Sequence, residues 1–199
     1  GQDFDVILAD PPWSFSGNSV ARPGRNVRRH YSTMTVAEVA AMPVREIAAP
    51  RALLLLWITV PHEHRANEVI EAWGFRAKSR LVWDKRRIGA GYWARNQHEP
   101  LIVATRGRFP CPRPALFPTS IIPGERREHS RKPEWVQDVV DARLPDTRRI
   151  ELFARRQRDG WTCWGNDADR FDAVIEGREW MVEPTAITPP FPQQMSLFS

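Results

Sequence analysis

The residues Asp10, Pro11, Pro12 and Trp13 are the stretch whose types most clearly indicate chemistry. A carboxylate accepts hydrogen bonds from an amine, and a large aromatic ring stacks on a flat base. The two prolines between them stiffen the chain, because their rings fix the backbone angle φ. The tetrapeptide therefore suits a planar base that carries an exocyclic amino group.

A buried strand is expected to position this tetrapeptide. The segment Asp5–Ala9 is short and apolar, and the prolines end the strand because neither can donate a hydrogen bond to a neighbouring strand. Asp10 would then lie at the carboxyl end of a strand, where ligands bind in open α/β sheets. Taken alone, the tetrapeptide fits equally well a strand end followed by a Pro-rich turn.

The rest of the chain alternates strand and helix patterns, which predicts an α/β fold with a mainly parallel sheet and helices on both faces. Thr35 and Glu38 have the spacing of a helix-capping box, and Gly74 is placed to end a helix. Further strands are expected at residues 52–58, 80–83, 101–104, 149–153 and 161–164, helices near 35, over 62–73 and from 133, and long loops at 14–30 and 85–97.

The composition predicts one folded domain over residues 1–178 and an extended Pro-rich tail over residues 179–199. No stretch approaches the ~20 apolar residues of a membrane span, and no signal peptide opens the chain. Cys111 and Cys163 lack the spacing of metal ligands, and His62 and His64 would point in different directions on a helix. We therefore expect a cytoplasmic protein without a metal site.

Positive charge favours a polyanionic partner. The net charge is +5, and nearly all of the 29 basic residues are arginines. The expected loops concentrate them: Arg22, Arg25, Arg28 and Arg29 follow the tetrapeptide, and Arg86, Arg87 and Arg95 accompany Tyr92 and Trp93. Arginine interleaved with aromatic residues is typical of nucleic-acid surfaces. The alternative is that arginine replaces lysine because of the base composition of the genome.

The chain resembles the DPPW-type adenine methyltransferases (the MT-A seventy family) from about Asp5 to about Asp167. That family includes the catalytic subunit that methylates adenosine in eukaryotic mRNA and many bacterial and phage DNA enzymes. Besides the tetrapeptide, the resemblance rests on seven segments in the family's order: His30–Met34, Leu53–Trp57, Val82–Lys85, Arg95–Glu99, Lys132–Glu134, Ile150–Arg155 and Trp164–Asn166.

This resemblance implies a Rossmann-like fold that uses S-adenosylmethionine, with a permuted order in which the catalytic motif comes first. The amine of adenine is a poor nucleophile because its lone pair is delocalised into the ring. Asp10 and the Pro11 carbonyl would accept hydrogen bonds from both amine protons, and Trp13 would stack on the base. The chain also shows no phosphate-cradling glycine loop, which argues against a nucleotide di- or triphosphate.

By resemblance, Lys132 should meet the carboxylate end of the cofactor, Glu151 and Arg155 its ribose, and Asn166 and Asp167 its ribose or adenine. The expected cofactor-binding residues are Asp10, Lys132, Glu151, Arg155, Gln157, Arg158, Asn166 and Asp167. Gln157 and Arg158 stand in for a His and an Asn of the eukaryotic subunit. For the run 149–158, the alternative is a solvated basic face.

The expected substrate-binding residues lie in the two loops and at their ends: Arg25, Arg28, Tyr31, Lys85, Arg95, Asn96, His98 and Glu99. A structural hydrogen bond is the alternative for His98 and Glu99. The sequence thus predicts methylation of the 6-amino group of adenine in nucleic acid, with DNA favoured. The alternatives are an RNA substrate and a catalytically silent nucleic-acid-binding partner subunit, against which the intact tetrapeptide argues.

The last six residues, 194–199, read QMSLFS and are similar to the peptide by which bacterial replication and repair proteins dock on the sliding clamp. Gln194 would bind at the edge of a hydrophobic pocket that receives Leu197 and Phe198. The preceding prolines would act as a tether and raise the local concentration of the enzyme on DNA. The alternative is that Leu197 and Phe198 fold back onto the domain.

Overall fold

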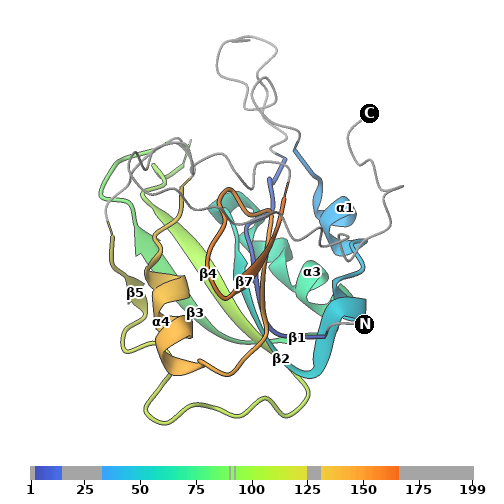
Figure 1. Ribbon diagram of the computed structural model, residues 1–199. Coiled ribbons are helices and arrows are strands. Elements are labelled where there is room, and N and C mark those ends of the chain that lie inside the picture. Colours follow the sequence, from blue (N-terminus) through green and yellow to red (C-terminus); the bar gives the residue numbers. More distant parts are fainter. Residues whose placement is uncertain (1–2, 15–32, 90, 92, 125–130, 166–199) are drawn as a thin grey trace.

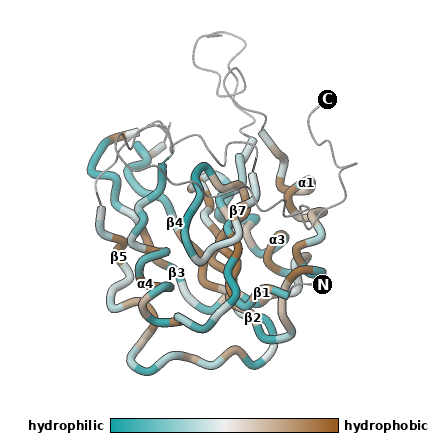
Figure 2. Tube along the Cα trace, viewed as in Figure 1, coloured by the Kyte–Doolittle hydropathy of each residue, from teal (hydrophilic) through white to brown (hydrophobic). Residues whose placement is uncertain are grey.

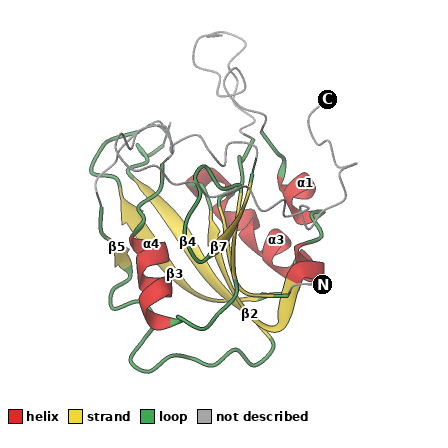
Figure 3. Cartoon of the chain, in the orientation of Figure 1, coloured by secondary structure: helices red, strands yellow, loops and turns green. Residues whose placement is uncertain are grey.

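The computed structural model describes residues 3–14, 33–89, 91, 93–124 and 131–165 (Figures 1 and 3). Within them, the strands are β1 Phe4–Ala9, β2 Ala48–Trp57, β3 Arg76–Asp84, β4 His98–Arg106, β5 Ile121–Ile122, β6 Arg149–Leu152 and β7 Trp161–Trp164. The helices are α1 Val36–Ala40, α2 Val44–Ile47, the 3-10 helix η4 Val60–Arg65, α3 Ala66–Ala72 and α4 Trp135–Arg143.

The described strands form a seven-stranded sheet in the order β5-β3-β4-β2-β1-β6-β7. β1 is parallel to both of its neighbours, β2 and β6. β7 is parallel to β6, and β5 is parallel to β3. β4 runs antiparallel to β2 and β3. The predicted mainly parallel, Rossmann-like α/β fold is confirmed. β1 lies inside the sheet, which explains why its sequence is almost continuously apolar.

Apolar side chains project from both faces of the sheet and form two hydrophobic clusters. Ile7 and Leu54 point to the cluster that contains α1, α2 and α3, whereas Leu8 and Leu55 point to the cluster that contains Val136 of α4. This alternation follows from the period of two in a strand. In Figure 1, α4 lies on one side of the sheet and α1 and α3 on the other, and Figure 2 shows the hydrophobic strands between them.

The predicted local signals at helix ends are confirmed at two positions. The Thr35 hydroxyl accepts from the Glu38 backbone N–H, and the Glu38 carboxylate accepts from the Thr35 backbone N–H at 2.6 Å, a complete capping box. Gly74 follows α3 with a φ of 82°, a left-handed conformation that glycine adopts without strain. The expected helix over 62–73 is instead divided into η4, which has Pro61 in its first turn, and α3.

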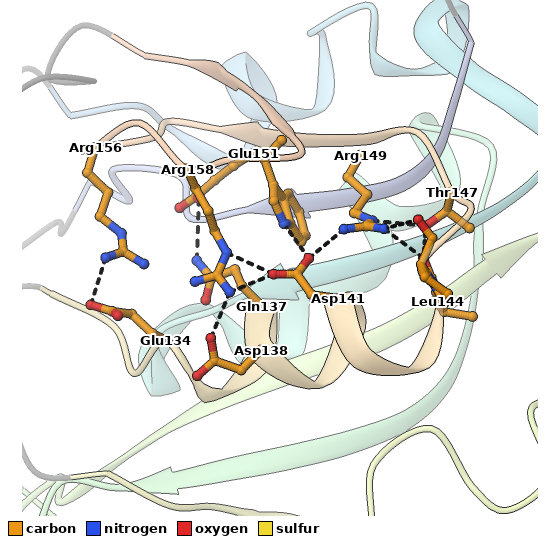
Figure 4. A network of polar contacts seen from close by, with 12 residues as sticks. Glu134, Gln137, Asp138, Asp141, Leu144, Thr147, Arg149, Glu151, Arg156 and Arg158 are labelled. Atoms are coloured by element: carbon orange, nitrogen blue, oxygen red, sulfur yellow. Dashed lines mark hydrogen bonds and ion pairs between the residues drawn. The ribbon is translucent and has the colours of Figure 1, made fainter. Parts of the chain in front are cut away.

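A polar network fastens α4 to β6 and β7 (Figure 4). The Asp141 carboxylate of α4 accepts from Arg149, Arg158 and Trp161 at 2.6 to 3.0 Å. Arg158 also donates to Asp138 at 2.7 Å. Burial alone would raise the pKa of Asp141, but these donors outweigh it and lower that pKa. The network fixes α4 on its face of the sheet, where α4 supports the carboxyl end of β6.

Two short elements were not expected from the sequence, and the strands β2, β3 and β4 begin earlier than expected. β5 has two residues and α2 has four, too few to show a period. The first five residues of β3 are exposed and carry arginine and lysine, so they have no buried-strand pattern. The predicted domain boundary near 178 and the tail 179–199 lie outside the described residues. No helix among the described residues is long and apolar enough to cross a membrane.

Candidate active site

The strands bring several of the expected site residues to one edge of the sheet. Asp10 follows β1, and its backbone N–H donates to the Leu152 carbonyl at the end of β6. Because β4 is antiparallel, its first residues, including Glu99, lie at the edge where β1, β2 and β6 end. Asp10 and Glu99, which are 89 positions apart in sequence, therefore lie at the same edge, where α/β sheets bind ligands.

A buried ion pair lies at this edge. Lys132 Nζ donates to both carboxylate oxygens of Asp10 at 2.8 Å, and the side chains are 14% and 17% exposed. The ammonium lies 3.7 Å from Glu99 Oε2 and 5.5 Å from the centre of the Trp57 ring. Burial alone would lower the pKa of Lys132, but the two carboxylates outweigh it and raise that pKa. The ammonium thus stays charged and holds Asp10 in a fixed orientation.

The ion pair continues as a row of alternating charges. Lys85, at the end of β3, lies 3.6 Å from Glu99 Oε1. The order along the row is Lys85, Glu99, Lys132 and Asp10. The structure thus joins two residues predicted to bind substrate to Lys132 and the predicted catalytic carboxylate. The Lys132 ammonium contacts Asp10 and Glu99 in this structure, and its expected contact with the cofactor stays a prediction.

The prolines and Trp13 form a short turn whose backbone is held on both sides. The Pro11 carbonyl accepts from the Trp13 N–H at 2.9 Å, and the Pro12 carbonyl accepts from the Met34 N–H at 2.7 Å. Ser14 N–H donates back to the Met34 carbonyl at 2.8 Å, so the two ends of the segment 15–32 are joined. The Pro11 carbonyl keeps a second lone pair for another donor.

Trp13 is buried in this structure, with 4% of its surface exposed. Its indole N–H donates to the Trp57 carbonyl at 3.1 Å, and its ring stacks on His62 at 5.6 Å and 25°. The predicted stacking of Trp13 on a base is therefore not supported by the geometry. Its contacts are those of a residue that braces the turn beside Asp10.

His62 is a residue of this site that no sequence motif identifies. Its Nε2 lies 2.8 Å from the Ser14 carbonyl and must donate to it, so its Nδ1 accepts from the Thr59 hydroxyl at 2.7 Å when the ring is neutral. Burial lowers the pKa of His62 more than the Ser14 carbonyl raises it, which favours this neutral form. His62 links the turn after β1 to the segment after β2.

The carboxyl end of β6 carries a second buried carboxylate. Glu151 Oε2 accepts from Gln137 of α4 at 3.3 Å (Figure 4). Burial, more than any other influence, raises the pKa of Glu151. Directly after the strand, Phe153 has a φ of 64°, a conformation that is rare for a bulky residue. A Cβ at Gly165 would lie 2.6 Å from the Ala154 carbonyl oxygen, so only glycine allows this close approach.

The remaining expected residues have different outcomes. Arg158 donates to Asp138 and Asp141, which commits it to α4, so its expected cofactor contact is not supported. Gln157 is exposed, and Arg155 is half-buried near the end of β6. Arg95, Asn96 and His98 lie in or beside the loop after β3. The predicted site residues Arg25, Arg28, Tyr31, Asn166 and Asp167 lie outside the described residues.

Comparison with known proteins finds similarity to one family along most of the chain. A family model described as MT-A70 matches residues 4–167. The chain is 32% identical over 180 residues to the type II methyltransferase M.MunI of a Mycoplasma species, covering 81% of this chain and 76% of that protein. It is 30% identical over 190 residues to the human N(6)-adenine-specific methyltransferase METTL4 and 28% identical over 184 residues to the N(6)-adenosine-methyltransferase MT-A70-like of Arabidopsis thaliana. The alignment with METTL4 covers 86% of this chain and 39% of that protein. The alignment with the Arabidopsis protein covers 87% of this chain and 25% of that protein.

Replacing Glu151 with glutamine should change stability in a pH-dependent way. A carboxyl with a raised pKa in the folded protein destabilises the fold as pH rises through the unfolded value, about 4.3, and then through the folded value. Glu151→Gln removes this charge and keeps an acceptor for Gln137. We expect the variant and the parent to unfold at the same urea concentration below about pH 4, and the variant to be the more stable at pH 7. A less stable variant at pH 7 would show that the ionised carboxylate stabilises the fold.

Proposed function

The chain belongs to the MT-A70 family, and from this membership we propose that it transfers a methyl group from S-adenosylmethionine to the 6-amino group of adenine in nucleic acid. The relatives named above are methyltransferases, two of them named for adenine or adenosine. The observation that carries the proposal is the position of Asp10, a buried and ion-paired carboxylate at the ligand-binding edge of the sheet.

Asp10 has the properties that an acceptor for the amine requires. Lys132 uses one lone pair on each carboxylate oxygen, and the remaining lone pairs accept from donors on the other side. An accepted hydrogen bond draws the N–H electrons toward nitrogen and makes its lone pair more available for attack. The Pro11 carbonyl, one residue away, can accept the second N–H of the amine. A preorganised contact of this kind is typically worth about 10²–10³ in rate.

The methyl transfer forms one nitrogen–carbon bond as one sulfur–carbon bond breaks. When bound, S-adenosylmethionine supplies a methyl group on a positively charged sulfur. The attacking nitrogen becomes positive during the transfer, and the Asp10 carboxylate stabilises this charge. The nitrogen then loses one proton, which Asp10 accepts or passes to water, and the product is the neutral methylated amine.

The donor set at the edge fits the chemistry of this cofactor. Glu151 is a carboxylate suited to accept from ribose hydroxyls, and it lies at the end of β6 near the half-buried Arg155. Phe153 and Trp164 pack edge to face at 5.8 Å and provide apolar surface for a flat base. We propose Asn166 and Asp167, which follow β7 in sequence, as further contacts to ribose or adenine.

We favour DNA as the substrate, with RNA as the alternative. The bacterial relative M.MunI is named a type II methyltransferase, and the alignment covers 76% of its length. The segments that follow β1 and β3 in sequence would provide recognition, through Arg25, Arg28 and Tyr31 in one and Arg95 and Asn96 in the other. A duplex target would have to extrude its adenine at a cost of a few kcal/mol.

The direct test is methylation with a labelled methyl donor. The protein is incubated with S-adenosylmethionine carrying a labelled methyl group and with either DNA or RNA, and the products are digested to nucleosides. We expect label in N6-methyldeoxyadenosine and a fall of at least about 10²-fold for Asp10→Asn. Calorimetry should show that Asp10→Asn still binds the cofactor.

Lys132 provides the matched variants for this experiment. Lys132→Arg keeps the positive charge beside Asp10 and should retain more activity than Lys132→Met, which removes it. Equal activity of Lys132→Met and the parent would contradict the role given to the ion pair. No methylation of DNA or RNA by the folded parent protein would favour a silent binding subunit.

We also propose that residues 194–199 dock on a bacterial sliding clamp in the cytoplasm of a bacterial or phage-infected cell. The support is the sequence itself, in which Gln194 precedes Leu197 and Phe198 by the spacing of clamp-binding peptides, after a Pro-rich segment. Adjacent apolar anchors on an extended peptide suit a preformed hydrophobic pocket.

A peptide covering residues 192–199 should bind the isolated clamp in calorimetry. Replacing Leu197 and Phe198 with alanine should abolish binding, whereas replacing the spacers Met195 and Ser196 should have little effect. In the full-length protein the Leu197 and Phe198 double variant should methylate short oligonucleotides normally. A lower melting temperature for this variant, with no clamp binding by the peptide, would indicate that the tail folds back onto the domain.

A further inference from the structure

The loop between β3 and β4, residues 85–97, presents large apolar side chains to solvent. Trp93 is completely exposed, with a relative accessible surface of 103%, and Ile88 is 68% exposed. An exposed tryptophan has a large surface with no partner, and tryptophan is enriched among residues that dominate binding energies. The loop therefore has a feature that folding alone does not explain.

Hydrogen bonds join the two ends of this loop where it meets the sheet. The Lys85 N–H donates to the Gln97 carbonyl at 2.9 Å, and the Gly89 N–H donates to the Asn96 carbonyl at 2.8 Å. The Asp84 carboxylate accepts from the Arg86 N–H at 2.8 Å and from the Gln97 side chain at 3.1 Å. These contacts fix where the chain leaves the sheet and where it returns.

Close backbone approaches shape the rest of the loop. A Cβ at Gly89 would lie 2.6 Å from the Asn96 carbonyl oxygen, and a Cβ at Gly91 would overlap the Ala94 carbonyl oxygen. Arg95 closes the same turn by donating to the Gly89 carbonyl at 2.7 Å. The loop therefore approaches itself closely at both of its described glycines, on the side of Trp93 that leads back to β3.

The charges around Trp93 favour a polyanion. Residues 84–97 contain four basic residues, Lys85, Arg86, Arg87 and Arg95, and one acidic residue, Asp84. The Asp84 carboxylate is occupied by donors of the loop, which lowers its pKa, first through the Arg86 backbone and then through Gln97. Arg86 and Arg87 are exposed. A protein partner with an apolar surface would not need this density of positive charge.

The loop begins beside the proposed reaction centre. Lys85, its first residue, contacts Glu99, and Glu99 contacts Lys132, the partner of Asp10. Trp93 and Glu99 are six positions apart in sequence, so their Cα atoms lie at most about 22 Å apart. One strand of nucleic acid advances roughly 3.4 Å per nucleotide, so this reach corresponds to a few nucleotides on either side of the target.

We propose that the loop binds the nucleic-acid strand next to the target adenine, with Trp93 stacked on an unpaired neighbouring base and Arg86 and Arg87 on the flanking phosphates. This inference rests on the proposed function. It adds that the substrate is bound as a strand whose bases near the target are unstacked from one another. Stacking does not depend on base identity, because every base has a flat face. Trp93 therefore supplies affinity, and recognition of the sequence falls to other residues.

The test is fluorescence anisotropy with a labelled single-stranded DNA 12-mer that contains one adenine. Trp93→Ala should weaken binding by roughly 5- to 150-fold, the range of one lost base–aromatic stack. Trp93→Phe, which keeps a flat ring, should retain most of the affinity. Cofactor binding should be unchanged in Trp93→Ala.

An arginine pair provides the control for charge. Arg87 and Arg76 are both exposed, but Arg76 begins β3 and lies at the other end of that strand. Arg87→Ala should reduce the dependence of log Kd on log salt by about 0.7, the value for one lost phosphate contact on a single strand. Arg76→Ala should leave this slope unchanged. Equal effects of the two variants would mean that only net charge matters and would overturn the phosphate contacts.

Two results would overturn the role of Trp93. One is unchanged affinity of Trp93→Ala for the 12-mer. The other is a parent protein that sediments as a dimer, which Trp93→Ala converts to monomer without loss of DNA affinity; the loop would then bind a second copy of the chain. If Trp93 is required for binding but the parent methylates neither DNA nor RNA, the proposed reaction fails and the binding surface stands.

Discussion

The ion pair between Lys132 and Asp10 is the interaction on which the proposed site depends. An ammonium with 14% of its side chain exposed has lost most of its hydration, and it remains charged only because carboxylates surround it. Removing one member of a buried pair typically costs about 3–5 kcal/mol, since the other charge is left without a partner. The pair therefore fixes both the protonation state of Lys132 and the direction in which Asp10 presents its free lone pairs.

The direction of β4 makes this arrangement possible. If β4 were parallel to its neighbours, Glu99 would lie at the far edge of the sheet, and Lys132 would have one carboxylate partner instead of two. The reversal also turns the connection from β3 to β4 into a hairpin loop, residues 85–97, which starts next to the charged row. One feature of topology thus places the second carboxylate and the proposed substrate-binding loop at the same edge.

Much of this fold could be predicted because its signals are local. The β1 pattern, the capping box of Thr35 and Glu38 and the glycine after α3 each act within a few residues. The approach of Lys132 to Asp10 joins residues 122 apart, and no local pattern reveals it. The stacking of His62 on Trp13 is of the same kind.

Arg158 shows that a motif does not reveal the tertiary partners of its side chains. Its segment has the family's order, but the guanidinium reaches Asp138 and Asp141 of α4, two carboxylates placed on one side of that helix by a spacing of three. The start of β3 is not predictable for another reason: its first five residues are exposed, so they show no buried-strand pattern. Tertiary partners decided both outcomes, and a single sequence does not show them.

The central claim is that Asp10, held by Lys132, accepts a hydrogen bond from the amine of the target adenine. A crystal structure of the protein with adenosine and a non-reactive analogue of the methyl donor measures this directly. We expect the 6-amino nitrogen at about 2.7–3.2 Å from an Asp10 carboxylate oxygen, with Lys132 still paired to Asp10. An adenine whose amine points away from Asp10, or a Lys132 that has left Asp10 to bind the cofactor, would contradict it.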